Sequence, residues 1–262
     1  MRLVKKINLI SILLFVFSIN IITNSEAALY IDDTSTVDKG HLELSTSFDY
    51  YTDEKKEYDA ETESYTKNVS REIDITADLT FGLSDRWDMG ISVPYQFMND
   101  SSFGKVNGFC DFIISSKYRL WDECDTFASY ALSLDLKADN ANKEKELGTG
   151  ELDYTITNIF TKCFQKFILD LNLGYTFVGG EDDDIFIYCF DITKDLNKNI
   201  SLCNEIYGEN TFNKKFNYSI LIFASSLSFQ LNKTVSLESG VGIGISKSSP
   251  DFQFSSTVTF SF

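Results

Sequence analysis

The last twelve residues of the chain, 251–262, alternate between two kinds of side chain. Every second position holds Phe252, Phe254, Ser256, Val258, Phe260 and Phe262, and the positions between them hold Gln253, Ser255, Thr257, Thr259 and Ser261. Successive side chains of a β-strand point to opposite faces, so this period of two predicts a strand with one aromatic face and one hydroxyl face. An amphipathic strand of a soluble sheet has the same pattern, so the rest of the chain must decide what the aromatic face meets.

The N-terminal residues have the order of a secretory signal peptide. Arg2, Lys5 and Lys6 precede an apolar run over 7–22, and a short polar stretch then leads to Ala27 and Ala28. Basic, apolar and small-residue segments in that order are typical of a segment removed on export. We therefore expect residues 1–27 to be a signal peptide, cleaved after Ala27 or Ala28, and residues 28–262 to form the exported domain.

The exported part has no apolar run long enough for a spanning helix, yet it is rich in aromatic residues. The sequence contains 23 Phe and 13 Tyr, an unusual number for an acidic exported chain. Hydrocarbon offers no partner to a free backbone N–H or C=O, so a chain without spanning helices can cross a bilayer only as a closed β-barrel. The two prolines, Pro94 and Pro250, agree with a continuous sheet, because each proline in a sheet removes a ladder hydrogen bond.

Alternating segments recur along the whole exported part. Twelve can be laid out, at 40–50, 71–83, 86–97, 109–120, 127–138, 151–161, 166–178, 185–195, 198–208, 216–231, 234–246 and 251–262. In 216–231 the apolar face falls on even-numbered positions up to Ile222 and on odd-numbered positions from Leu227. This change predicts a β-bulge at 224–226. The connections are alternately long and short, as in barrels with long outer loops and short periplasmic turns. The longest and most charged connection, 51–70, is expected to be an exposed, mobile loop.

A soluble barrel would show the same alternation with inside and outside exchanged. About eight strands already enclose a space that side chains can fill, and a wider soluble barrel would need a continuous apolar interior. Loop asymmetry and a terminal phenylalanine have no explanation in a soluble barrel. The sequence therefore favours an all-β fold, a transmembrane antiparallel up-and-down β-barrel of about 12 strands.

The final strand resembles the assembly signal of bacterial outer-membrane β-barrels. Its apolar residues are Phe254, Val258, Phe260 and Phe262, and the last of them ends the sequence. The resemblance implies that the barrel-assembly machinery reads this strand, and that outer-membrane lipid surrounds the barrel.

Four further stretches, 82–95, 108–120, 148–154 and 172–179, resemble the outer-membrane transporter family named after the meta-cleavage pathway of phenol degradation. The resemblance implies a bacterial outer-membrane location and a route for small aromatic or apolar solutes, and it supplies no catalytic residue. Cys110 and the stretch 137–139 depart from the family pattern, which bears on the geometry of loops and not on the fold.

If the apolar faces meet lipid, the opposite faces line the lumen. The lumen-lining candidates are mostly acidic: Glu43, Glu72, Asp74, Asp78, Asp88, Asp111, Lys117, Arg119, Asp135, Asp153, Asp170, Glu205 and Glu238. Rings of carboxylates favour cations and repel anions, so these residues predict a narrow path with a cation preference. The alternative is that the acids are merely hydrated, or pair with Lys117, Arg119 and Lys137 to plug the barrel.

An apolar strip for an uncharged solute is a further hypothesis, with Ile113, Ile159, Leu221 and Phe223 as its residues. Such residues more often pack under an inward loop.

Several classes of function are disfavoured. The formal net charge of −16, more negative still without the basic N-terminus, argues against nucleic acid as a partner. The five cysteines are odd in number and match no metal-site spacing, so no metal or cofactor is expected. The one histidine, His41, has no pattern of a catalytic pair around it, so we expect no enzyme activity. A structural or surface-interaction outer-membrane protein acting through its extracellular loops remains the alternative to a channel.

Overall fold

The computed structural model describes residues 29–59, 64–101, 104–180, 183–211 and 219–262. The expected signal peptide, residues 1–27, lies outside the described residues. Thirteen strands and one short 3-10 helix are present in the described part: β1 (Leu42–Asp59), β2 (Ser64–Ser84), β3 (Trp87–Asp100), β4 (Gly104–Phe109), β5 (Ile113–Trp121), β6 (Ser129–Lys137), η1 (Lys143–Lys145), β7 (Asp153–Cys163), β8 (Ile168–Phe177), β9 (Ile185–Asn197), β10 (Ile200–Thr211), β11 (Ser219–Gln230), β12 (Val235–Gly244) and β13 (Phe252–Ser261).

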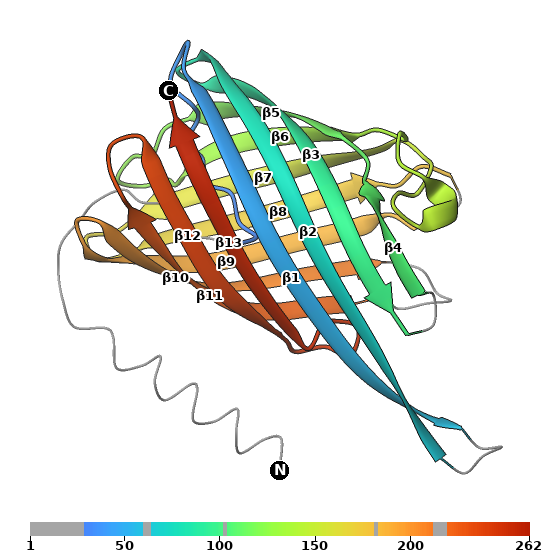
Figure 1. Cartoon of the computed structure of the whole chain (residues 1–262). Helices are drawn as coiled ribbons and strands as arrows, with labels where there is room; N and C mark the ends of the chain where they lie inside the picture. Colours follow the sequence, from blue (N-terminus) through green and yellow to red (C-terminus); the bar gives the residue numbers. More distant parts are fainter. Residues whose placement is uncertain (1–28, 60–63, 102–103, 181–182, 212–218) are drawn as a thin grey trace.

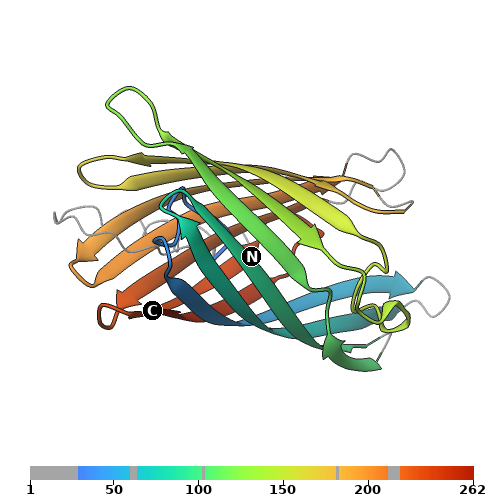
Figure 2. The ribbon, with the colours of Figure 1, turned by 90° about the horizontal axis from the view of Figure 1, so that it is seen from above.

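All thirteen strands belong to one antiparallel sheet that closes on itself (Figure 1). β13 pairs with β1, β2 pairs with β3, and β3 pairs with β5, so the ring contains 12 strands and β4 is an addition attached to β3. Seen from above, β1 and β2 lie on the opposite side of the barrel from β7 to β9 (Figure 2). The prediction of a closed antiparallel barrel of about 12 strands is confirmed.

The distribution of side chains is the reverse of that in a soluble protein. Large apolar residues such as Ile75, Leu79 and Phe190 are exposed on the outside of the sheet, while Asp170 and Gln253 are buried on its inside. Charged residues are rarely buried in soluble proteins unless they are paired. The outer surface is therefore suited to lipid, and the polar face is enclosed. Among the described residues no helix combines the length and the apolar character needed to cross a membrane.

The predicted strand 109–120 corresponds to β5, which begins only at Ile113, and a further short strand, β4, precedes it. β4 ends at Phe109 and β5 begins at Ile113, and both pair with β3. Pro94 of β3 lies beside the break, where its carbonyl accepts a hydrogen bond from the N–H of Cys110. Proline has no N–H to return to the neighbouring strand, so the ladder is interrupted at this point. The chain between β4 and β5 bonds instead to the connection 138–152, with Asp111 accepting from the N–H of Ala141.

The prediction of a loop at 51–70 is wrong for most of its length. β1 and β2 pair continuously up to Asp59 opposite Ser64, and Figure 1 shows this hairpin extending beyond the rim of the barrel. Backbone hydrogen bonds hold an antiparallel pair whether or not one face is apolar, and residues such as Thr66 and Val69 favour strands. The end of hydrophobic alternation therefore marks the end of the lipid-facing part, not the end of the strand.

The predicted bulge at 224–226 is also absent, because β11 pairs in unbroken register with both β10 and β12. Ile220 and Ile222 lie on the same face as the buried Ala224 and Ser226. The inner face of β11 is apolar at Ile220 and Ile222 and polar at Ser226 and Ser228. In the sequence, this change of composition looks the same as a bulge that turns the apolar residues to the other face. Leu221 and Phe223 consequently lie on the outer face, and their place in the proposed lumenal strip is wrong. Ile159, by contrast, is fully buried.

The inside and outside of β2 can be distinguished by placing the same charge on each. Ile75→Arg would put a guanidinium on the lipid face near the middle of the bilayer, and is expected to lower the free energy of unfolding by about 2 kcal/mol or more. The adjacent Thr76→Arg would place the same group on the opposite face, between Asp74 and Asp78, with a smaller expected loss. Denaturant titration of both variants in lipid vesicles measures the difference. Equal losses, or a larger loss for Thr76→Arg, would contradict the assignment of the two faces.

Candidate functional site

A segment preceding the first strand enters the barrel and crosses its interior. Residues 29–38 have no regular secondary structure and lie inside the ring as the blue coil of Figure 1. The segment is fixed to the wall at both ends, since the N–H of Leu29 donates to Glu205 at 2.7 Å and the N–H of Val37 donates to Asp88 at 3.2 Å. We call residues 29–38 the strap.

The middle of the strap is bonded to β5, β6 and β7. The N–H of Thr34 donates to the hydroxyl of Thr161 at 3.0 Å, and the hydroxyl of Thr34 bonds that of Ser129 at 2.6 Å. Asp32 forms an ion pair with Lys117 at 2.9 Å. The strap therefore bridges β10, β7, β6, β5 and β3, and divides the interior into two cavities.

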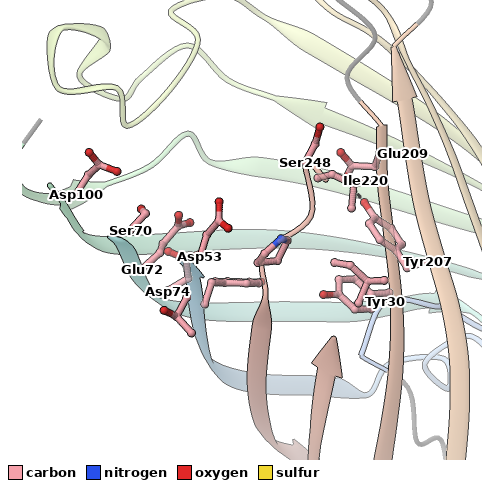
Figure 3. A pocket seen from close by; sticks show the side chains of 14 residues that line it. Tyr30, Asp53, Ser70, Glu72, Asp74, Asp100, Tyr207, Glu209, Ile220 and Ser248 are labelled. Carbon is pink, nitrogen blue, oxygen red and sulfur yellow. Dashed lines mark hydrogen bonds between the residues drawn. The ribbon is translucent and has the colours of Figure 1, made fainter. Parts of the chain in front are cut away.

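The first cavity, of about 570 Å³, opens toward the end of the barrel with the long connections. Its lining includes five carboxylates and three tyrosines, and Figure 3 shows Tyr30 and Tyr207 across the cavity from Glu72 and Asp74. The carboxylates are Asp53, Glu72, Asp74, Asp100 and Glu209, and the tyrosines are Tyr30, Tyr51 and Tyr207. We call it the long-loop cavity.

Aromatic and aliphatic groups form one side of the long-loop cavity. The rings of Tyr30 on the strap and Tyr207 on β10 are stacked, with centroids 4.4 Å apart. Ile220, Ile222 and Pro250 lie on the same cavity wall. The cavity therefore offers both a flat aromatic surface and a negative potential.

The second cavity, of about 590 Å³, lies toward the end with the short turns and is bounded by residues 31–35 of the strap. We call it the short-turn cavity. It contains Glu43, Asp170 and Glu238 from the wall, together with Arg119. Both cavities are within the range of small-molecule sites, roughly 300–1,000 Å³.

A group of buried acids lies on β8, β9 and β10 behind the strap. Asp191 is opposite both Asp170 and Glu205 in the sheet, and Asp191 and Glu205 are each only 1% exposed. Asp191 accepts hydrogen bonds from the N–H of Asp170 at 2.9 Å and from the hydroxyl of Thr193 at 2.8 Å. Hydrogen bonds from neutral donors therefore hold these carboxylates in place.

The basic side chains of the interior are paired with acids. Lys137 bonds Asp111 at 3.2 Å and Asp153 at 2.6 Å, and joins the break between β4 and β5 to the start of β7. Arg119 pairs with Asp122 at 3.1 Å in the turn after β5. Lys117, Arg119 and Lys137 are thus each held in a local ion pair, and the remaining carboxylates dominate the walls of the cavities.

One acid outside the membrane-spanning part has a shifted pKa. Burial raises the pKa of Glu123, in the turn between β5 and β6, but hydrogen bonds from Lys162 and from the N–H of Cys163 outweigh it and leave the pKa below its usual value. Glu123 therefore forms an ion pair with Lys162 beside the short-turn cavity.

The structure brings together some of the predicted lumen-lining residues and separates others. Glu72 and Asp74 line the long-loop cavity, and Glu43, Arg119, Asp170 and Glu238 line the short-turn cavity. Asp88, Lys117 and Glu205 bind the strap, and Asp111 and Asp153 bind Lys137. Asp78 lies near Ser45, and Asp135 near Ser133. Phe254, Phe260 and Phe262 of the C-terminal strand are exposed on the outside, with Val258 partly exposed.

Sequence reasoning missed the strap and several residues that it contacts. Tyr30, Asp32, Asp33 and Thr34 lie in a stretch with no periodicity, and Tyr51 was assigned to a loop. Asp191 could have been found from the sequence. Tyr188, Phe190 and Ile192 alternate with Cys189, Asp191 and Thr193, so a strand with the first three facing lipid places Asp191 inside. In the part of the chain that the structure describes, no group of three or more His, Cys, Asp or Glu is arranged to hold a metal ion.

Comparison with known proteins identifies both a family and a fold. A family model described as "Putative MetA-pathway of phenol degradation" matches residues 32–262. The COG4313 outer membrane channel from Pseudomonas putida F1 has a similar structure, with 14% sequence identity, a TM-score of 0.72, and coverage of 90% of this chain and 100% of that one.

Two other solved structures share the fold less closely. The NanC porin has a TM-score of 0.54 at 9% identity, with coverage of 84% of this chain and 98% of that one. The CymD monoaromatic hydrocarbon channel has a TM-score of 0.51 at 6% identity, with coverage of 85% and 88%. Among curated proteins none matches the chain. The shared architecture is that of outer-membrane channels.

The ion-paired group at Lys137 yields a stability prediction. Lys137→Met would leave two carboxylates, Asp111 and Asp153, buried at 4% and 5% exposure without their cation, and is expected to destabilise the barrel by about 3 kcal/mol. Lys162→Met removes a more exposed pair with Glu123 and should cost about 1 kcal/mol or less. Unfolding midpoints in the same detergent compare the two variants. A loss for Lys137→Met no larger than that for Lys162→Met would show that this group is not a structural anchor.

Proposed function

Since the chain belongs to the family of the MetA pathway of phenol degradation, we propose that it is an outer-membrane channel that passes small solutes through the barrel interior. The observation that carries the proposal is the pair of cavities on either side of the strap, which together reach from the long-loop end toward the short-turn end. Passage rather than catalysis is proposed, because neither cavity has His41 on its wall and both are lined largely by carboxylates and hydroxyls.

The proposed solutes are small aromatic molecules that are neutral or positively charged. The stacked pair Tyr30 and Tyr207 can receive a ring, and aromatic faces also attract cations. The carboxylates of the long-loop cavity repel an anion of the same size. One of the proteins with a similar fold is a monoaromatic hydrocarbon channel, which agrees with this class of solute.

Liposome swelling with three matched aromatic probes tests the proposal. Vesicles containing the protein should admit phenol and benzylammonium faster than benzoate, which has a similar size and the opposite charge to benzylammonium. Swelling no faster than in empty vesicles for all three, or fastest swelling with benzoate, would refute the proposed selectivity.

The charge of the long-loop cavity can be changed directly. The double variant Glu72→Gln, Asp74→Asn removes two carboxylates from its wall, and the cation-to-anion permeability ratio should fall at least about fivefold, since each unit charge at about 4 Å in water contributes roughly 1 kcal/mol. Reversal potentials in a salt gradient across a planar bilayer measure this ratio. The double variant Asp139→Asn, Glu144→Gln, in the exposed connection 138–152 and outside the lining of both cavities, is the matched control and should leave the ratio unchanged.

A second candidate, an interaction protein acting through its extracellular part, is favoured by the β1–β2 hairpin that extends beyond the rim (Figure 1). Shortening the hairpin by deletion of residues 55–68 distinguishes the two roles. If transport is the main role, swelling rates for phenol should stay within about twofold of wild type, because both cavities keep their linings. A tenfold loss of uptake would show that the hairpin takes part in solute entry.

A further inference from the structure

The buried carboxylate of Glu205 has an unusual set of partners. Its two oxygens accept hydrogen bonds from consecutive backbone N–H groups, Leu29 at 2.7 Å and Tyr30 at 3.1 Å. The remaining donor is the thiol of Cys189, at 3.8 Å. All three donors are neutral, and the residue opposite Glu205 on β9 is another acid, Asp191.

No positively charged side chain among the described residues is paired with Glu205 or Asp191. Asp191 is bound by the N–H of Asp170, the hydroxyl of Thr193 and the thiol of Cys203. Two like charges buried side by side need a nearby cation or a strong set of donors to be held in the charged form.

The missing cation can come from the main chain itself. The N–H of Leu29 that touches Glu205 lies next to the expected cleavage point, after Ala27 or Ala28. Hydrolysis of that peptide bond by the signal peptidase consumes water, releases the leader with a new carboxylate, and leaves an α-amino group on the exported chain. At neutral pH much of this group is protonated, because its ordinary pKa is about 8.

For either cleavage point, the new amino group is that of Leu29, whose nitrogen bonds Glu205, or of the residue directly before it. If the chain begins at Leu29, the nitrogen now 2.7 Å from Glu205 Oε1 is the ammonium itself. If it begins at Ala28, the ammonium is one residue away, and neighbouring Cα atoms are about 3.8 Å apart. We propose that Glu205 is the docking site for the mature amino terminus, whose ammonium group neutralises the Glu205–Asp191 pair and fixes the strap across the bore.

This docking has a consequence for the path. Tyr30, next to the docked terminus, stacks on Tyr207 and lines the long-loop cavity, whereas residues 31–35 bound the short-turn cavity. The strap end therefore stands at the junction of the two cavities. Release of the terminus would leave the strap attached through its later contacts, which include Lys117, Thr161, Ser129 and Asp88, and would widen the connection between the cavities.

Docking protects the α-amino group from reaction, which gives a direct test. Purified full-length exported protein is treated with an amine-acylating ester near pH 6.5, and the acylated terminus is measured by peptide mass spectrometry. In wild type the terminal peptide should begin at Ala28 or Leu29 and react at least about tenfold more slowly than in Glu205→Gln, a protection equivalent to about 1.4 kcal/mol. Glu238→Gln makes the same change elsewhere in the interior, and its terminus should stay protected.

A second variant leaves the barrel wall intact. Insertion of two glycines before Leu29 moves the ammonium about 7 Å along the chain and should abolish protection, even though Glu205 is present. If Glu205→Gln does not assemble, the insertion variant alone tests whether the amino terminus docks at Glu205. Equal reactivity in wild type and in the insertion variant overturns the proposal, as does an exported chain that begins elsewhere than Ala28 or Leu29.

Conductance in planar bilayers separates this inference from the proposed function. Larger single-channel conductance in the insertion variant, together with loss of protection, is the expected result. Loss of protection with no conductance in any variant would support docking and refute the channel. Conductance in every variant with an unprotected wild-type terminus would support the channel and refute docking.

Discussion

The structure depends on one requirement, that every backbone hydrogen-bonding group in the lipid-facing zone has a partner in the protein. A single sheet meets this requirement only by closing, and here the first strand and the last strand make the closure. β1 pairs with β13 from Glu43 opposite Ser261 to Thr52 opposite Phe252, and the N–H of Phe262 donates to Leu42 at 2.8 Å. Because the side-chain period of a strand is two, this register also decides which residues face lipid and which are enclosed.

The interruption of the ladder beside Pro94 is compensated by hydrogen bonds and ion pairs from side chains and a loop. Pro94 removes a donor where β4 should continue into β5, and Asp111 and Phe112 turn to the connection 138–152 for their hydrogen bonds. Lys137 then holds Asp111 and Asp153 together on the inside. The polar group at this point is therefore a consequence of the broken ladder, and it removes one of the basic residues from the solute path.

The sequence predicted the closed barrel, the number of ring strands and the exposed aromatic face of β13, because these follow from local alternation. It failed wherever the signal is not local. The β1–β2 hairpin outside the bilayer is held by backbone pairing that needs no apolar face, so hydrophobicity could not mark its end. Ile220 and Ile222 point inward and line a cavity near the rim. The pattern of one strand cannot show that its inner face is apolar at that height. The strap has no periodicity at all, and its contacts with Glu205, Thr161 and Lys117 depend on tertiary structure.

The strap also occupies space that the wall of a barrel of this width leaves open. A ring of 12 strands is wider than its own side chains can fill, so an empty bore would be a wide aqueous hole. The strap occupies the middle of that space, and its aspartate neutralises Lys117 while its tyrosine stacks on the opposite wall. Acids along the two cavities are then left with little basic charge to balance them. The same segment that narrows the bore therefore also leaves the cavity walls mainly acidic, and it places the ring of Tyr30 on the wall of the long-loop cavity, which also carries carboxylates.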